Sequence, residues 1–355
     1  MLEREFSAAD EERYNRPARY AVSSHTWGVP AVYHHGEHTH QLHVRAGGGP
    51  DYADVACNVS TVGSPCLPSL ICMKIGSMGY DGSSMMRRYV PPRLLALSAL
   101  FTVAGFFAVR FPDVPGTAAG SLVSTVLIAL PAFFAFFKRF GTRRAMVALG
   151  LLSLFGFAVE LTGVATGFPY GEFSYSDELG PKIAGLVPYG LPVSWAPLVL
   201  GAVAATEPRR RRRSRRSLTG WVLAAALLLV ALDGVLDPGA ARLGFWVWPH
   251  GGVYFGVPLS NYAGWLLSSV LAASLLLALL PWSDTRPVPG MLDSAIISLA
   301  FWISVAVFTR LWLPALLGVG LFAFLLWRRH SLKEDSVIEA SLEPLESRVA
   351  GVGGR

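Results

Sequence analysis

Residues 218–238 read LTGWVLAAALLLVALDGVLDP and combine the two features that decide the fold. From Leu218 to Leu232 the segment is almost entirely apolar, and an α-helix needs about 20 such residues to cross the hydrocarbon core of a bilayer. Two acidic residues, Asp233 and Asp237, follow directly. Because an ionisable side chain in hydrocarbon is costly unless it serves a cavity, a partner or a reaction, the segment predicts a membrane helix that carries part of a functional site.

Similar apolar segments recur along the chain from Pro91 onward. Of the 355 residues, 52% are hydrophobic and only 15% are charged, which is typical of a membrane protein rather than a soluble domain. We therefore expect an all-α fold, a polytopic membrane bundle of about seven to eight transmembrane helices. The expected spans are 91–111, 118–137, 145–162, 186–206, 218–236, 262–281, 292–309 and 311–327. The last two are short and closely joined, so they form a hairpin or one of them is re-entrant.

The chain divides into three predicted parts. Residues 1–85 mix Gly, Ser, His and charged residues without helical or strand periodicity, which predicts a poorly ordered extension or a translation start placed too far upstream. Residues 86–330 form the helical transmembrane domain, and residues 331–355 form an acidic, solvated cytoplasmic tail. The extension holds a histidine tract, residues 34–43, and three cysteines, but no pairing typical of metal sites. No metal site, disulfide framework or redox role is expected.

Basic residues predict the orientation in the cell membrane. The arginine run 209–216, interrupted only by Ser214, lies between two apolar segments. It is typical of a cytoplasmic anchor under the positive-inside rule, and nucleic acid is not an expected partner. The other basic clusters, which fall on the same side, lie at residues 87–93, 138–144 and 328–333. Both termini are therefore expected in the cytoplasm, with the long loops 163–182 and 237–261 together on the outside.

Three acidic residues are expected at similar depth. Glu160 lies close to the outer end of the third span, and Asp233 and Asp237 lie at the outer end of the fifth, which runs in the same direction. The two aspartates share a helix face if the helix persists, although Pro238 indicates that the helix ends there. The alternative to a functional role is a structural salt bridge. The basic residues available for such a bridge are Arg242 and Lys182.

Two segments around these acids, 160–195 and 233–265, are rich in Gly, Pro and aromatic residues. Gly and Pro at this density cannot continue a helix, so the chain is expected to form a compact cap that closes a cavity. The alternative is that the aromatic residues form an interfacial belt at the membrane surface. The candidate substrate-binding residues are Tyr170, Tyr175, Trp195, Trp246, Trp248, Tyr254, Asn261 and Trp265.

Carboxyl groups and aromatic rings without metal ligands favour acid catalysis on an alkene. A carboxylic acid in an apolar site keeps its proton near neutral pH and can donate it to a weak base. Aromatic faces and a second carboxylate stabilise the carbocation so formed. We expect Asp233 or Glu160 to be the general acid and Asp237 to position water. The remaining roles fall to Trp246, Trp248 and Tyr254 as the cation-stabilising wall, and to Asn261 or Tyr254 as further water ligands.

The pattern of the two segments is Glu160-x-x-Gly163, Gly167-x-Pro-Tyr-Gly171, Tyr175, Leu179-Gly180, Pro192 and Trp195, then Asp233, Asp237-Pro238, Trp246-x-Trp248, Gly252-x-Tyr254-x-Gly256-x-Pro-x-x-Asn261 and Trp265. It resembles the membrane carotenoid hydratases, which include enzymes of halophilic archaea, and the resemblance covers residues 91–327. This resemblance implies hydration of a terminal double bond of a long linear carotenoid, of the bisanhydrobacterioruberin to bacterioruberin type, without a cofactor. The implied partners are the carotenoid, water and the lipid bilayer.

Two other functions remain open. The spacing Asp233-x-x-x-Asp237 is also that of the second acidic motif of membrane prenyltransferases, which bind a magnesium diphosphate, but a convincing first motif is missing. A proton-coupled transporter also carries acids within the membrane, usually near its midplane, whereas the acids here crowd one edge. Magnesium dependence favours the first alternative, and proton flux in liposomes favours the second.

Overall fold

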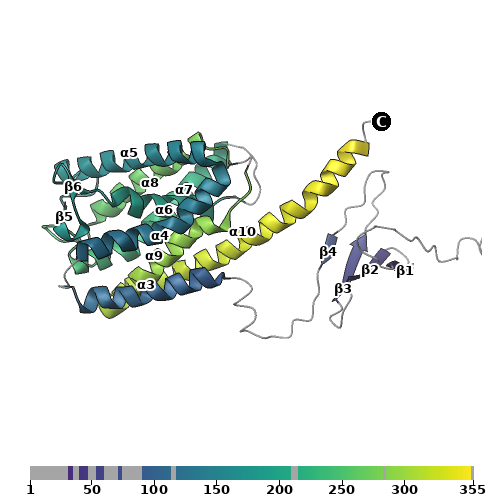
Figure 1. Ribbon diagram of the computed structural model, residues 1–355, viewed down its shortest axis with the longest axis horizontal. Coiled ribbons are helices and arrows are strands. Elements are labelled where there is room, and N and C mark those ends of the chain that lie inside the picture. Colours follow the sequence, from purple (N-terminus) through teal and green to yellow (C-terminus); the bar gives the residue numbers. More distant parts are fainter. Residues whose placement is uncertain are drawn as a thin grey trace, which may run out of the picture. The chain divides into compact units, whose positions relative to one another are not determined.

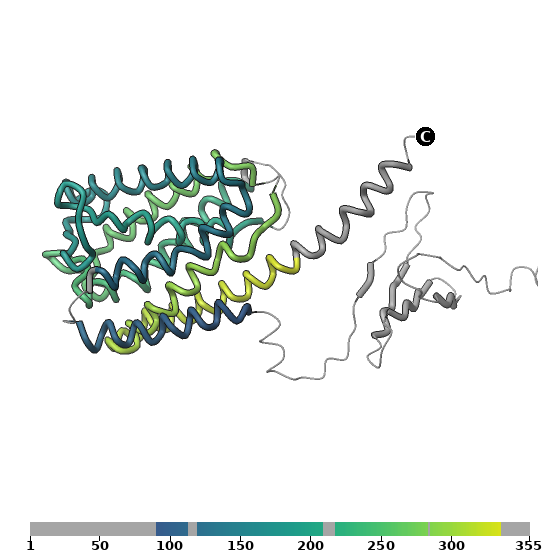
Figure 2. Tube along the Cα trace, in the orientation of Figure 1, coloured from purple at the N-terminus to yellow at the C-terminus, as the bar shows by residue number. Residues whose placement is uncertain are grey.

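The computed structural model divides the chain into two units, Met1–Gly82 and Ser83–Arg355, which are described separately. In the first unit the described residues are four strands. The second unit is helical and is shown in Figures 1 and 2. Its described residues are 90–112, 117–208, 215–282 and 285–352.

The strands of the first unit form an antiparallel sheet with the order β1-β2-β3-β4. They are β1 (Ala31–His34), β2 (His40–Ala46), β3 (Ala53–Val59) and β4 (Ile71–Met73). No strand is predicted here from the sequence, because the alternation of apolar and polar residues is too short to stand out from its surroundings. The expectation of poor order for the rest of residues 1–85, the alternative of a translation start further downstream and residues 35–39 of the histidine tract lie outside the described residues.

The second unit contains eight α-helices among its described residues. They are α3 (Pro92–Arg110), α4 (Thr117–Phe140), α5 (Thr142–Thr166), α6 (Leu191–Ala205), α7 (Arg215–Leu243), α8 (Leu259–Leu279), α9 (Asp293–Phe308) and α10 (Trp312–Val352). Seven of these helices are long and apolar enough to cross a membrane, and α6, with 15 residues, is shorter. The prediction of an all-α, multi-pass membrane bundle is therefore confirmed.

The short helix α6 packs against α4, α5, α7 and α9 and lies among them in Figure 1. Every residue from Trp195 to Ala205 except Leu198 is buried. At 1.5 Å per residue its 15 residues extend about 22 Å, which is less than the roughly 30 Å of a hydrocarbon core. The chain just before it includes the buried strand β7 (Val187–Pro188). Irregular backbone beside a short membrane helix is tolerated where it is itself buried in protein, as the two residues of β7 are.

Close packing fixes α3 and α10 on α9. A Cβ atom on Gly105 of α3 would lie 2.7 Å from the carbonyl oxygen of Phe301, so only glycine allows this approach. The hydroxyl of Ser304 also donates to the carbonyl of Thr102 at 2.6 Å. Helices α9 and α10 pack together as a hairpin with Arg310 in the turn at φ 63°, so of the two predicted arrangements the hairpin is the one observed.

Two regions that the sequence predicts to be cytoplasmic, the arginine run and the C-terminal tail, are only partly described. Residues 209–214 of the arginine run lie outside the described residues. Helix α10 continues past residue 331 into the predicted tail and remains helical to Val352. Side chains of α10 are described up to Glu334.

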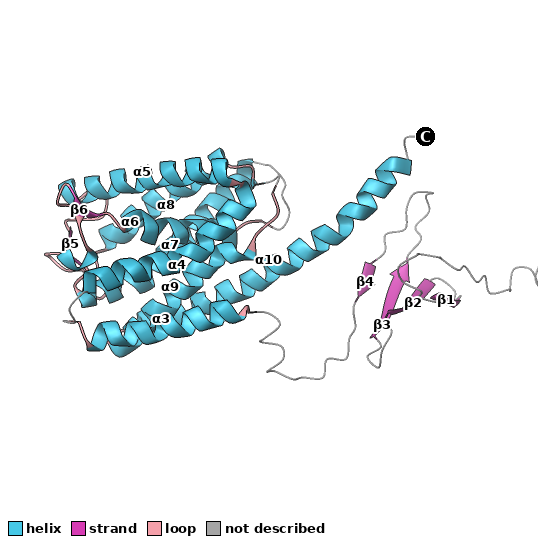
Figure 3. Ribbon diagram, viewed as in Figure 1, coloured by secondary structure: helices cyan, strands magenta, loops and turns pink. Residues whose placement is uncertain are grey.

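The two long loops meet over one end of the helices, and we call residues 167–190 and 244–258 the cap (Figure 3). Strand β5 (Ser174–Tyr175) of the first loop pairs with strand β8 (Trp246–Val247) of the second, which sets Tyr175 opposite Trp246. The first loop also contains a 3₁₀ turn, η1 (Asp177–Leu179), and the strand β6 (Lys182–Ile183), which pairs with β7. The cap therefore joins the end of α5 to the end of α7, where the acids lie.

Candidate active site

One cavity of about 730 Å³ lies beneath the cap. This volume is in the range of sites that hold one organic ligand. All the predicted site residues except Tyr254 line it, so the structure brings both acidic segments to one place. Further wall residues come from α3, α4 and α9. These include Ala104, Phe107, Ala108, Phe111, Ser121, Ser124, Thr125, Ile128, Ser298, Phe301 and Trp302.

Glu160 enters the cavity from α5 and is buried. Its carboxyl accepts a hydrogen bond of 2.8 Å from the hydroxyl of Tyr175, which the β5–β8 pairing places beside it. Burial raises the pKa of the Tyr175 hydroxyl well above its usual value, and the neighbouring Glu160 carboxylate raises it further. Tyr175 is therefore a permanent donor to Glu160 near neutral pH.

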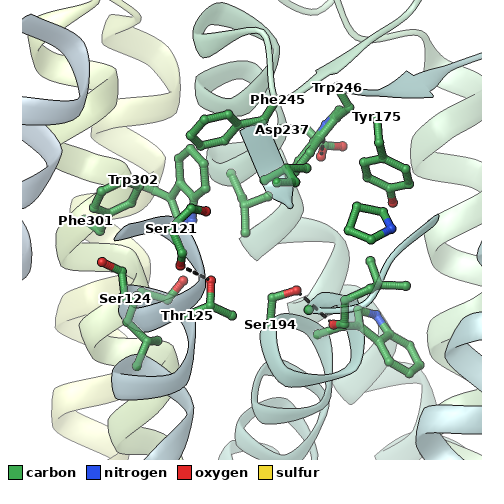
Figure 4. A pocket seen from close by; sticks show the side chains of 18 of the residues that line it. Ser121, Ser124, Thr125, Tyr175, Ser194, Asp237, Phe245, Trp246, Phe301 and Trp302 are labelled. Atoms are coloured by element: carbon green, nitrogen blue, oxygen red, sulfur yellow. Dashed lines mark hydrogen bonds between the residues drawn. The ribbon is translucent and has the colours of Figure 1, made fainter. Parts of the chain in front are cut away.

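Asp233 and Asp237 lie on one face of α7, one helical turn apart, and both are buried. The side-chain amide of Asn261, on α8, lies between them. Its Nδ2 donates to Asp237 and lies 3.5 Å from Asp233 Oδ2. Asp237 also accepts a hydrogen bond of 3.2 Å from the indole of Trp246. Figure 4 shows Asp237, Trp246 and Tyr175 grouped on one side of the cavity.

The prediction that the helix ends at Pro238 is wrong, since α7 continues through it to Leu243. Proline lacks an N–H, so the carbonyl four residues earlier, that of Gly234, loses its helical donor. The hydroxyl of Tyr254 supplies one at 3.1 Å. Because Tyr254 is used in this way and does not line the cavity, the structure does not place it in the predicted cation-stabilising wall.

The aromatic wall is built around Tyr170, which fits between two glycines. A Cβ atom would lie 2.7 Å from the Tyr170 ring if placed on Gly163 and 2.6 Å if placed on Gly264. The Tyr170 ring is 5.9 Å from that of Trp265, which is 6.4 Å from that of Trp195. Burial raises the pKa of Tyr170, with a further contribution from Glu160.

The burial of these rings bears on the alternative of an interfacial belt. Tyr170, Trp195 and Trp248 are all less than 9% exposed, whereas rings in a belt face lipid or water. Exposed aromatic residues of the cap, such as Phe168 and Tyr189, are not predicted site residues. The buried rings are therefore part of the cavity wall rather than a lipid-facing belt.

The alternative of a structural salt bridge is not observed in the described part of the chain. Lys182 instead donates to the carbonyl of Tyr175 and pairs with Asp177, lowering the pKa of that exposed carboxyl. Within the described residues, no basic side chain forms an ion pair with the three cavity acids. Nor do three or more His, Cys, Asp or Glu side chains there form a group that could hold a metal ion.

Sequence reasoning missed the part of the wall formed by α3, α4 and α9. Most of its residues are alanines, phenylalanines and hydroxyl residues, which are common on membrane helices that only pack against one another. They carry no sequence signal that separates a cavity wall from a packing face. Trp302 and the cap residue Phe245, whose rings lie 6.4 Å apart, join this wall to the cap.

Comparison with known proteins finds one matching family and a similar relative. The family model described as carotenoid biosynthesis protein matches residues 116–325, which is more than half of the chain and includes both acidic segments. A protein of Haloarcula japonica named bisanhydrobacterioruberin hydratase is 37% identical over 240 residues, which cover 65% of this chain and 74% of the relative. No solved structure matches the chain.

Proposed function

Because the chain belongs to the carotenoid biosynthesis protein family, we propose that it is a hydratase that adds water to a terminal carbon–carbon double bond of a linear carotenoid. The similar hydratase of Haloarcula japonica makes a substrate of the bisanhydrobacterioruberin type the first candidate. The observation that carries the proposal is the grouping of Glu160, Asp233 and Asp237 in one buried, aromatic-lined cavity.

The cavity offers separate places for the reacting end of the carotenoid and for its chain. The carboxyl groups lie under the cap, while Phe107, Ala108 and Ile128 of α3 and α4 line an apolar part of the cavity. Phe107 is 52% exposed, so this part of the cavity reaches the lipid-facing surface of the bundle. A long polyene that lies among the acyl chains therefore enters from the bilayer and places only its end group beside the acids.

The hydrogen bonds favour Asp233 as the proton donor. A carboxylate is stabilised by the hydrogen bonds that it accepts. Asp237 accepts from Asn261 and Trp246, whereas Asp233 has a long contact with Asn261 and a side-chain hydrogen bond with Asp237 itself, which requires a proton on one of the two carboxyls. Three buried carboxyls without a cationic partner also cannot all be ionised at low cost, because like charges repel strongly in a low-dielectric site. We assign the acidic proton to Asp233 and the ionised form to Asp237.

The reaction then proceeds in two balanced steps. Asp233 gives its proton to the less substituted carbon of the alkene, and the π-electron pair forms the new C–H bond, leaving a tertiary carbocation. The indole of Trp246 and the carboxylate of Asp237 stabilise this cation. Water adds to the cation, and the oxonium so formed loses one proton to the Asp233 carboxylate, which restores the acid. Since no electron is transferred to or from the substrate, the proposed reaction needs no redox cofactor.

The other two functions are not favoured. The similar relative is a hydratase and not a prenyltransferase or a transporter. The acids also lie next to the cap at one end of the bundle, whereas the acids of an ion-coupled transporter are usually near the midplane.

We also propose that both termini lie in the cytoplasm and that the cap faces the outside, since Arg215 and Arg216, the last residues of the arginine run, begin α7 at the end opposite to Asp237. A reporter that is active only in the cytoplasm, fused after Arg355, is expected to be active. The same reporter inserted at Gly185 in the cap is expected to be silent. The reverse pattern would show that the orientation is inverted.

The function is tested by expressing the full chain in cells that accumulate the anhydro carotenoid. Mass spectrometry is expected to find products heavier by one or two waters. Asp233→Asn is expected to lower the rate by about 10²- to 10⁴-fold, the usual contribution of a general acid, and Asp237→Asn and Glu160→Gln are expected to be impaired. Asp177→Asn, at an exposed acid of the cap, is the matched control and should be active. Full activity of all three cavity variants would remove the acids from the mechanism.

A further inference from the structure

Four hydroxyl side chains lie on the part of the cavity wall that the proposed reaction does not use. They are Ser121, Ser124 and Thr125 of α4 and Ser298 of α9. Figure 4 shows the three α4 residues beside Phe301 and Trp302, on the other side of the view from Asp237. The neighbouring wall residues from α3 are alanines and phenylalanines, so the hydroxyls form a polar area in an otherwise apolar region.

The helix register brings the four hydroxyls into one cluster. The Ser294 hydroxyl donates to the carbonyl of Ala129 at 3.2 Å and accepts from the N–H of Ala132 at 3.0 Å. Gly290, one turn earlier, faces Ala135, so α9 runs antiparallel to α4. One turn beyond Ser294 on α9 is Ser298, and one turn before Ala129 on α4 is Thr125. These two residues therefore lie at the same level, with Ser124 and Ser121 next to Thr125 on α4.

The hydrogen-bonding capacity of this cluster is largely unused. Ser298 is only 8% exposed, lines the cavity and has no hydrogen-bond partner among the described residues. Ser121 and Ser124 also have no such partner for their side-chain hydroxyls. Thr125 donates to the carbonyl of Ser121 at 2.8 Å, and its oxygen can still accept. Ser298 lines the cavity, so a ligand that fills the cavity shields this hydroxyl from water, and the ligand is stabilised there if one of its own polar groups pairs with Ser298.

We propose that this cluster is a binding subsite for a hydroxyl group carried by the carotenoid end, and that it makes the enzyme select hydroxylated polyenes over hydrocarbon polyenes with the same terminal alkene. An alcohol matches the cluster because it both donates and accepts one hydrogen bond, as serine does. The inference rests on the proposed function, since it concerns the substrate of the same cavity. The hydroxyl recognised here is distinct from the one formed beside Asp237.

Discrimination by such a site has a physical basis. A pocket built to hydrogen-bond a substrate hydroxyl rejects an analogue that lacks it, because the buried polar groups of the protein are then left unpaired. A purely apolar wall cannot discriminate strongly in this way. A store of water in the cluster is the competing role. It would serve both kinds of substrate equally, so the comparison of two substrates separates the two roles.

The test uses the full-length protein and two polyenes that share the terminal alkene, one with a hydroxyl near that end and one without. For the wild type, kcat/KM is expected to be at least about tenfold higher for the hydroxylated polyene. Ser298→Ala and Ser124→Ala are each expected to lower kcat/KM for the hydroxylated polyene by about tenfold, the effect of one lost hydrogen bond, and to leave the hydrocarbon unaffected. Ser269→Ala is the matched control, because Ser269 is buried without a partner on α8 and does not line the cavity.

Equal losses for both polyenes, or no loss for either, would overturn the subsite. Binding of both polyenes is also measured, by quenching of tryptophan fluorescence. If the wild type binds the hydroxylated polyene more tightly in a Ser298-dependent way but hydrates neither, the proposed function fails and the subsite is supported. If it hydrates both polyenes without preference, the proposed function is supported and the subsite fails.

Discussion

The hydroxyl of Tyr254 lies 3.1 Å from the carbonyl oxygen of Gly234 and replaces the helical donor that Pro238 lacks. This contact joins the cap to the turn of α7 that carries Asp233 and Asp237. A proline inside a helix kinks it, because its ring clashes with the carbonyl one turn earlier and leaves that carbonyl without a helical donor, and at membrane depth such a carbonyl cannot turn to water. Tyr254 therefore positions both aspartates although it does not line the cavity.

Tyr254→Phe is expected to lower the hydration rate several-fold and to reduce stability by about 1 kcal/mol, the usual net effect of one hydrogen bond. The cause is displacement of the turn that carries the aspartates, so kcat should change more than KM. The measurement is the rate of carotenoid hydration in membranes. Tyr189→Phe is the control, because Tyr189 is an exposed cap residue.

The same contact predicts a rescue. Pro238→Ala restores a backbone N–H that can donate to the Gly234 carbonyl, so Tyr254 is no longer needed for that purpose. The double variant Pro238→Ala with Tyr254→Phe is expected to be more active than Tyr254→Phe alone. If the added alanine does not restore activity, Tyr254 acts in some way other than through Gly234.

Asn261→Ala is expected to lower the hydration rate by about 10- to 100-fold, since hydrogen bonds to charged groups contribute about 1.5–3 kcal/mol. The amide of Asn261 lies between Asp233 and Asp237 and donates to the second, so its removal takes away one of the hydrogen bonds that stabilise Asp237 in its ionised form. Initial rates are measured by chromatography of the products. Leu259→Ala, at the exposed first residue of α8 and outside the cavity wall, is the control. A wild-type rate in Asn261→Ala would show that the bridge has no role in the reaction.

Ala108→Trp is expected to exclude the polyene. Ala108 lies on α3 in the part of the cavity that reaches the surface near the exposed residues Phe107 and Phe111. An indole there fills space that the polyene chain would occupy, so the expected result is a KM raised by about tenfold or more. Leu100→Trp places the same ring on the exposed surface of α3, outside the cavity wall, and should leave KM unchanged. Unaltered KM in both variants would place the entry route elsewhere.

The raised pKa of Tyr175 predicts how stability depends on alkaline pH. Burial and then Glu160 raise it above the usual 10.0, so the unfolded chain loses this proton at a lower pH than the folded protein. The stability contributed by the protonated hydroxyl is therefore fully present below pH 10 and is lost as the pH rises through the folded value. Thermal unfolding measured against pH should fall less steeply above pH 10 in Tyr175→Phe than in the wild type. The exposed Tyr189→Phe should follow the wild type.

The spans could be predicted from the sequence because each consists of a long apolar run, which only a membrane helix accommodates. The grouping of Glu160 with Asp233 and Asp237 could be predicted because the third and fifth membrane spans run in the same direction, so their outer ends lie on the same side of the membrane. The continuation of α7 through Pro238 could not, because its donor, Tyr254, is supplied by a different segment. The same holds for Ser298, whose hydroxyl differs from that of any helix-packing serine only through its place beside a cavity.

The far end of the bundle holds a buried ion pair whose strength can be tested apart from the active site. Arg139 of α4 donates two hydrogen bonds of 2.7 Å to Glu207, and its guanidinium lies 4.6 Å from the ring centroid of Trp282. Both charged side chains are buried. Removing one partner leaves an uncompensated charge, so Arg139→Met is expected to destabilise the protein by about 3–5 kcal/mol.

Replacing both residues removes the positive and the negative charge together, and such replacements often leave the stability of a protein unchanged. The double variant Arg139→Met with Glu207→Met is therefore expected to be more stable than Arg139→Met alone, as measured by thermal unfolding in detergent. Glu207 also accepts through its backbone carbonyl from Arg328, a bond that the side-chain replacement leaves in place. If the double variant is as unstable as the single one, the stabilisation comes from the other contacts of Arg139, with Trp282 and Thr285, rather than from the pairing of charges.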